Sequence, residues 1–213
     1  MNSGNYVQYK NNVIKGVGNK ELGNQAKITG SQKGDNGILY FVDKAILGPK
    51  NDAAKFIAND NELSEFYNLL YQAGLSDTTI NSETDLAYPH MSFLQLQESW
   101  TVFAPTNSAI NSARINGLIP DDKEKLKEFL LYHFVFDNVI FNDGKLSGTF
   151  CTAKIDSTGV DVAYCAPVEI VNQVDNLSVI DRKGSRVNVS NSTANNLIQF
   201  GVLHKIDNVL LEK

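Results

Sequence analysis

The fold of this chain is decided by a stretch near its C-terminus, Gly201-Val202-Leu203-His204-Lys205-Ile206-Asp207-Asn208-Val209-Leu210-Leu211. The same pattern occurs 164 positions earlier, as Gly37-Ile38-Leu39-Tyr40-Phe41-Val42-Asp43-Lys44-Ala45-Ile46-Leu47. The glycine, the first leucine, the aspartate and the last leucine are identical, and most other positions exchange one aliphatic residue for another. Each copy predicts a strand that begins at the glycine, breaks at the aspartate and resumes. A spacing of this size indicates a duplicated domain rather than a solenoid repeat.

The two copies imply a division of the chain. Gly48-Pro49-Lys50-Asn51-Asp52 is a short polar segment with Gly-Pro punctuation, which is typical of a linker. We therefore expect residues 1–48 to be the C-terminal fragment of one domain and residues 49–213 to be a complete second domain. A few strands without a partner sheet are marginally stable. We expect the fragment to pack on the complete domain or on a neighbouring molecule, through its strand edges.

The second domain begins with helical patterns and ends with strand patterns. Capping signals predict helices that begin after Asn59, Thr106 and Asp121. Short β-branched runs separated by turn residues dominate after Val135. The predicted strands are Trp100–Phe103, Val139–Phe141, Val160–Ala163, Val168–Val171, Leu177–Asp181, Arg186–Val189, Leu197–Phe200, Val202–Ile206 and Val209–Leu211. This order predicts an α+β domain with its helices on one side of an antiparallel sheet.

Composition excludes several classes of protein. Hydrophobic residues make up 42% of the chain, which is enough for a hydrophobic core. The net charge of −5 argues against binding to nucleic acid or to an anionic membrane surface. Apolar runs fall far short of the roughly 20 residues of a membrane span, so we expect no integral membrane segment. Met1–Asn5 have neither the basic nor the apolar region of a secretory signal.

The two cysteines, Cys151 and Cys165, are too few for a disulfide scaffold or for a zinc site built on cysteine. A hairpin centred on Thr158 would place them opposite each other, so they can form a disulfide. Two half-buried free thiols that pack as small hydrophobes are the alternative. The sequence leaves both possibilities open.

Signals for catalysis are weak. The three histidines, His90, His133 and His204, stand in unrelated contexts without metal-ligand spacing. His133 lies on the apolar stripe of its predicted helix, which favours a buried, hydrogen-bonded histidine. No nucleophile elbow or phosphate-binding loop is present. We therefore expect no catalytic residues, no metal site and no cofactor.

Three segments, in order, resemble the motifs of fasciclin domains. Thr101-Val102-Phe103-Ala104-Pro105-Thr106-Asn107-Ser108-Ala109-Ile110 is similar to the first signature of that family. Leu130-Leu131-Tyr132-His133 looks like its tyrosine–histidine motif, and Gly201 to Leu210 is similar to its second signature. By the same comparison, Gly37 to Leu47 resembles the second signature of a preceding fasciclin domain.

The resemblance implies a wedge of two β-sheets with a group of helices on one side. Such domains occur in tandem on cell surfaces and in extracellular matrices, where they act in adhesion. We therefore expect a non-catalytic adhesion or ligand-binding module, secreted or on the cell surface. Its partner would be a surface or matrix protein or a glycan. A structural spacer in a tandem array and an enzyme are the alternatives. The Asn-rich composition with few cysteines suggests a bacterial surface protein, which a lipid anchor could hold.

The resemblance also implies binding residues. The tyrosine–histidine motif of animal members has been implicated in integrin contact, which singles out Tyr132 and His133. The segment Ala87 to Ser99 departs from the compact family pattern, and its Tyr88 and Phe93 are candidates for a recognition loop. Exposed aromatic rings there would favour recognition. A broad contact between residues 1–48 and the domain would favour a spacer, and a pocket with convergent polar groups an enzyme or receptor.

Overall fold

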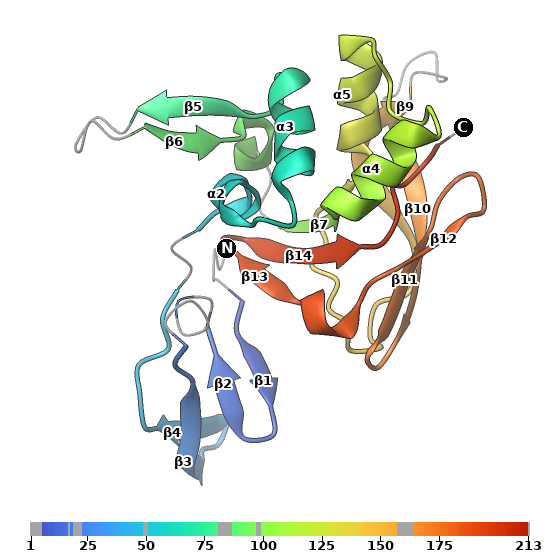
Figure 1. Ribbon diagram of the computed structural model, residues 1–213. Helices are drawn as coiled ribbons and strands as arrows, with labels where there is room; N and C mark the ends of the chain where they lie inside the picture. Colours follow the sequence, from blue (N-terminus) through green and yellow to red (C-terminus); the bar gives the residue numbers. More distant parts are fainter. Residues whose placement is uncertain are drawn as a thin grey trace.

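The computed structural model describes residues 6–16, 18, 23–48, 51–80, 87–96, 99–156 and 164–212. The first 48 residues supply a four-stranded sheet, and the rest of the chain forms an eight-stranded sheet, a two-stranded sheet and a group of helices (Figure 1). The expected α+β class is confirmed, with helices on one side of the large sheet. Within the described ranges, no helix combines the length and the apolar character needed to cross a bilayer.

The N-terminal sheet is an antiparallel meander in the order β1-β2-β3-β4, and it stands apart from the helices (Figure 1). Its strands are β1 (Gln8–Lys10), β2 (Val13–Lys15), β3 (Ala26–Lys33) and β4 (Ile38–Val42). Tyr6 reaches the second domain: its hydroxyl shares a hydrogen bond with Ser99 Oγ at 3.0 Å, and its ring meets Phe141 edge-on. Strand β4 lies at the edge of the sheet.

The large sheet has the order β12-β11-β10-β9-β8-β7-β14-β13, in which β7 and β14 are parallel and the other pairs are antiparallel. Its strands are β7 (Trp100–Pro105), β8 (Phe134–Phe136), β9 (Gly148–Asp156), β10 (Tyr164–Gln173), β11 (Asn176–Ile180), β12 (Arg186–Asn188), β13 (Asn196–Ile198) and β14 (Gly201–Ile206). A bridge between Val189 and Ile206 brings the end of β12 back to β14. The sheet therefore folds over on itself, and this produces the predicted wedge.

Two hydrophobic clusters hold the domain together. The first packs the helices on one face of the sheet, with Phe66 and Leu70 against Trp100 and Phe134. The second lies inside the wedge, where Phe103 and Tyr132 meet apolar side chains of β10, β11 and β12. Strands Trp100–Phe103 and Val202–Ile206, both predicted from the sequence, are buried along their whole length in the centre of this arrangement.

Among the described residues, the domain also contains four α-helices and two short 3-10 helices. They are α2 (Ala53–Asn59), α3 (Ser64–Gln72), α4 (Asn107–Ile115), α5 (Lys123–Leu131), η1 (Ser92–Leu96) and η2 (Asn191–Thr193). The predicted cap of α4 is confirmed, because Thr106 Oγ1 accepts the backbone N–H of Ala109. The cap of α5 is Asp122, one residue later than expected, and its carboxylate accepts the N–H of Lys125.

The predicted cap at Asn59 is wrong, because Asn59 is the last residue of α2 and the next helix begins at Ser64. A residue distant in sequence does the capping instead. Asn107 Oδ1 accepts the N–H of Glu65 at 2.9 Å, while its amide donates to Asn61 O. A side chain of the first signature thus holds the start of α3, which no local pattern around residue 59 could indicate.

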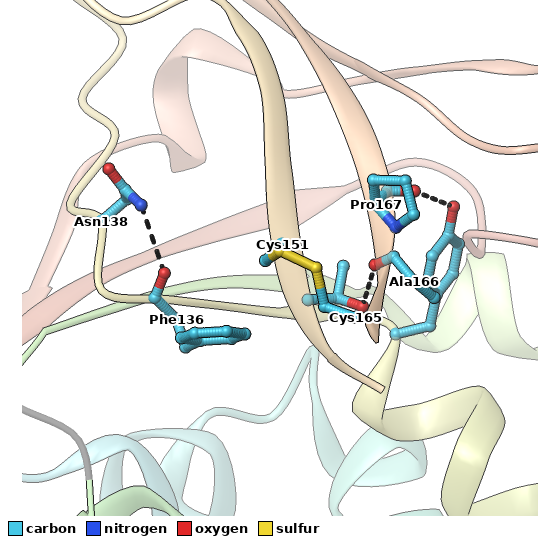
Figure 2. Close-up of a disulfide and its surroundings, with 8 residues drawn as sticks. Phe136, Asn138, Cys151, Cys165, Ala166 and Pro167 are labelled. Carbon is cyan, nitrogen blue, oxygen red and sulfur yellow. Dashed lines mark hydrogen bonds between the residues drawn. A yellow bond between two sulfur atoms is a disulfide. The ribbon is translucent and has the colours of Figure 1, made fainter. Parts of the chain in front are cut away.

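The two cysteines form a disulfide between β9 and β10, with their Cα atoms 5.3 Å apart (Figure 2). They are not directly opposite each other: Cys165 pairs with Ile155, Cys151 pairs with Pro167, and the register shifts between them. At this irregularity Thr152 Oγ1 donates to Ala166 O at 2.5 Å. The expected hairpin is therefore present, but its register is not the symmetric one that the cysteine positions suggest.

Two expected strands are absent from the described residues, and a third prediction is not tested. Residues 139–141 and 209–211 lie in loops, and the strand after α5 is β8, which ends at Phe136. Val160–Ala163 lies outside the described residues. The segment after residue 76 forms a two-stranded sheet of β5 (Asp77–Ile80) and β6 (Ala87–His90) beside α2 and α3 (Figure 1).

Candidate functional site

Tyr132 and His133, the two residues implied by the tyrosine–histidine motif, lie at the C-terminal end of α5 and are buried, with exposures of 1% and 0%. The inward orientation of His133 predicted by the helix periodicity is confirmed. Neither side chain forms part of the solvent-facing surface. The hydrogen bonds of these two side chains therefore show which segments of the domain they connect.

His133 joins three parts of the chain. Its Nδ1–H donates to Phe129 O at 2.9 Å, and its Nε2 accepts the backbone N–H of Leu210 at 3.0 Å. These partners require the neutral ring with the proton on Nδ1. Burial lowers the pKa of His133 to about 4, partly offset by the backbone hydrogen bonds. The histidine thus fixes the segment after β14 to the end of α5.

Tyr132 is fixed just as firmly. Its hydroxyl donates to Pro167 O on β10 at 2.9 Å and accepts the N–H of Arg182 at 3.1 Å. Burial raises the pKa of the phenol to about 12. The motif therefore connects α5 to β10, to the β11–β12 turn and, through His133, to the C-terminal segment.

His204 on β14 plays a similar role. Its Nε2–H donates to Ile140 O at 2.8 Å and its Nδ1 accepts the N–H of Asn195 at 3.3 Å. Burial lowers its pKa to about 4. The next residue, Lys205, reaches the helical side, where its ammonium contacts carboxylates of Asp60 and Glu62 at 2.6 Å.

The segment Ala87 to Ser99 brings one predicted recognition residue into the core. Phe93, in η1, is half-buried and packs edge-on against Trp100 and Phe134, with ring centroids 6.0 and 5.1 Å apart. The backbone of Tyr88 lies in β6 opposite Thr79, while its side chain is outside the described part of the structure. Phe93 therefore anchors this segment to the domain.

A cavity of about 220 Å³ opens between the start of α2, the same segment and the turn between β13 and β14. Its lining residues are Asp52, Ala53, Ala54, His90, Met91, Leu94, Trp100, Ile198, Gln199 and Phe200. Sequence reasoning did not find this site, because its walls come from four separate segments. One lining residue, Phe200, adopts a left-handed φ of 61° in the turn between β13 and β14, just before Gly201.

The polar groups at this cavity are few. His90 Nδ1 lies 3.2 Å from Asp77 Oδ1, and the imidazole is 17% exposed. Asp52 caps α2, because its carboxylate accepts the N–H of Lys55 at 2.8 Å. Gln199 is exposed at the opening. A mostly apolar hollow with a few polar groups at its edge suits binding of a side chain or a sugar ring better than proton transfer.

Comparison with known families decides what kind of domain this is. The family model for the fasciclin domain matches residues 61–212. The chain belongs to the fasciclin domain family. It is also similar to a solved FAS1 domain pair from fasciclin I, an insect cell adhesion molecule, with a TM-score of 0.50 and 15% identity. That match covers 98% of this chain and 67% of the other. A search of characterised protein sequences found no match.

The two signatures of this fasciclin domain lie side by side at its centre. The first spans β7 and the start of α4, and the second spans β14, which pairs with β7 in parallel. The tyrosine–histidine motif packs next to both, since Phe103 N donates to His133 O. Family membership therefore depends largely on residues that build the core.

No group of three or more histidine, cysteine, aspartate or glutamate side chains is arranged to hold a metal ion among the residues that the structure describes. In this fasciclin domain, His133 and His204 have both ring nitrogens bonded to backbone groups. Their lone pairs are thus not directed at a substrate.

Proposed function

We propose that this chain is a non-catalytic adhesion module that acts outside the cell or on its surface. The observation that carries the proposal is the fasciclin domain over residues 61–212. A likeness to a domain pair from a cell adhesion molecule supports the same class of function. Its partner in this proposal is a cell-surface or matrix protein or a glycan.

The burial of two histidines and the residue types that line the cavity support binding rather than catalysis. His133 and His204 are internal and neutral at physiological pH, because burial lowers their pKa values to about 4. Among the described residues that line the cavity beside His90 there is no serine, cysteine or lysine to act as a nucleophile. A serine, cysteine or lysine nucleophile within reach of a base is the usual requirement for acyl transfer through a covalent intermediate.

We assign partner recognition to the cavity opening and the segment that borders it. Phe93 packs this segment against Trp100, and the neighbouring Met91 and Leu94 line the cavity. We assign Tyr132 and His133 a supporting role, because they keep α5 and the C-terminal segment in place without being exposed. Tyr88, in the same strand as His90, is our candidate for a contacting residue.

The disulfide supports an extracellular setting. Disulfides persist in oxidising compartments and are rare in reducing ones. Cys151 and Cys165 form one across β9 and β10, at a point where the strand register is irregular. A bond there stabilises a hairpin that has lost part of its regular pairing.

The proposal is tested by binding of the purified chain to arrays of matrix proteins and glycans. Binding that survives washing supports adhesion. Gln199→Trp, which fills the cavity opening, is expected to abolish it, and Gln173→Trp, at an exposed position of β10, is the matched control. No binding to any arrayed ligand would favour the spacer role. An equal loss of binding in both variants would exclude the cavity as the binding site.

A further inference from the structure

The cavity beside α2 is built from segments that hydrogen bonds fix to one another. In the β13–β14 turn, Gln199 N–H donates to Asn51 O at 3.1 Å, which places the start of α2 against that turn. Trp100 N–H donates to Phe200 O at 3.0 Å, and the indole of Trp100 donates to Leu94 O at 3.0 Å. The walls are therefore in place before a ligand arrives, which lowers the entropic cost of binding.

The size and lining of the cavity limit its occupant. Its volume of about 220 Å³ lies below the roughly 300–1,000 Å³ of pockets for drug-sized ligands, so it suits one side chain or one sugar ring. Ala54, Met91 and Ile198 are 1–3% exposed and form an apolar floor, whereas Gln199 at the opening is exposed. The occupant therefore needs an apolar body and a polar end.

Asp52 supplies a partner for the polar end. Its Oδ1 accepts the N–H of Lys55 at 2.8 Å, while its Oδ2 has no hydrogen-bond partner among the described residues. A carboxylate oxygen beside an apolar floor attracts a cationic donor. His90, the other titratable residue of the described lining, adds no net positive charge, because the carboxylate of Asp77 lies 3.2 Å from its Nδ1.

The segment that supplies most of the cavity is strongly acidic. Residues 51–100 contribute seven of the ten lining residues that the structure describes. This segment contains eight aspartates and glutamates, one lysine and no arginine, whereas the rest of the chain contains eighteen basic and sixteen acidic residues. The excess of negative charge is thus concentrated in the segment around the cavity. Such a distribution complements a partner with a basic surface.

We propose that the cavity binds a lysine side chain presented by the basic surface of a partner protein. This inference rests on the proposed function, because it names the partner of the site to which recognition is assigned. The aliphatic stem of the lysine lies on the floor of Ala54, Met91 and Ile198, while the ammonium stays at the hydrated edge and contacts Asp52.

Two other occupants fit less well. The planar fork of arginine is matched by two carboxylate oxygens, and Oδ1 of Asp52 is already engaged in capping α2. A neutral sugar ring gains nothing from the acidic charge of residues 51–100. Lysine needs only one oxygen for its compact charge, and its stem covers the apolar floor.

The test uses blocked peptides Gly-Ser-Xaa-Ser-Gly, in which Xaa is lysine or acetyl-lysine. Binding to the whole chain is followed by the NMR signal of the indole N–H of Trp100, the single tryptophan, which lines the cavity. The lysine peptide is expected to shift this signal in a saturable manner. Affinity for the acetyl-lysine peptide, which keeps the stem and loses the charge, is expected to be at least about tenfold lower. Raising the salt to about 0.5 M should weaken lysine binding several-fold.

Asp52→Asn removes the charge and keeps the helix cap, because asparagine caps a helix about as well as aspartate. Affinity for the lysine peptide is expected to fall at least about tenfold in this variant, while affinity for the acetyl-lysine peptide stays the same. Asp121→Asn is the matched control, since this exposed carboxylate precedes α5 and does not line the cavity. The melting temperatures of both variants verify that the fold is intact.

Equal affinity for the two peptides overturns the proposal, as does equal affinity of the wild type and Asp52→Asn for the lysine peptide. A shift of the Trp100 signal by galactose or N-acetylglucosamine at lower concentrations than by the lysine peptide would assign the cavity to a glycan, and this too overturns it. These results leave the adhesion function standing. Lysine binding that depends on Asp52 supports the proposal even if the arrays show no ligand, and then the adhesion function alone fails.

Discussion

His133→Ala tests the central structural claim, that the motif histidine acts inside the domain. The substitution leaves the carbonyl of Phe129 and the N–H of Leu210 buried without partners. Each buried group left unsatisfied costs about 1–3 kcal/mol, and the space left by the imidazole adds to this. We therefore expect a loss of about 3–6 kcal/mol in the free energy of unfolding, equivalent to a fall in Tm of roughly 10 °C or more.

The assay is urea unfolding followed by tryptophan fluorescence. The chain has one tryptophan, Trp100, which is 4% exposed in β7 and packs against Phe134, the residue after His133. Tyr71→Ala is the control, because this side chain is 58% exposed on α3 and its loss should change stability by less than about 0.5 kcal/mol. An unchanged midpoint in His133→Ala, together with lost binding to an arrayed ligand, refutes the supporting role and makes the histidine a contact residue.

Three further outcomes follow from the same core. Acidification should destabilise the domain, because His133 and His204 have pKa values near 4 in the folded state and about 6.5 in the unfolded state. Their contribution to the free energy of unfolding is complete above pH 6.5 and falls by about 3 kcal/mol per histidine towards pH 4. Thermal melts recorded across this pH range measure the loss. Tyr132→Phe should lower the urea midpoint by the equivalent of about 1–3 kcal/mol; an unchanged midpoint would contradict the role of its two hydrogen bonds. Replacing Cys151 and Cys165 by serine, which opens a loop with a sequence separation of 14, should cost about 3 kcal/mol, with reduction of the wild type giving the same shift.

Features that depend on neighbouring residues were predictable from the sequence. The cap at Thr106 and the inward orientation of His133 follow from patterns within a single helix, and the structure confirms both. Strands with strong alternation, such as β14, were placed within a residue or two. The α+β class required only the order of these patterns along the chain.

Features that depend on distant residues were not predictable. The start of α3 is held by Asn107 from α4, so the local signal at Asn59 was misleading. The disulfide register is shifted by the irregularity in β9, which must pair with β8 as well as with β10. The cavity near His90 forms where four separate segments meet, and the sequence of no single segment predicts it.

By itself, the sequence determined the family and the class of fold, because signatures and periodicity are carried by residues close together in the chain. The tertiary structure alone decided which motif residues are accessible. Tyr132 and His133 are buried because α5, β10 and the C-terminal segment converge on them. It also decided that β4 is exposed while β14, which has a similar sequence, is buried, since β14 lies between β7 and β13 whereas β4 lies at the edge of its sheet.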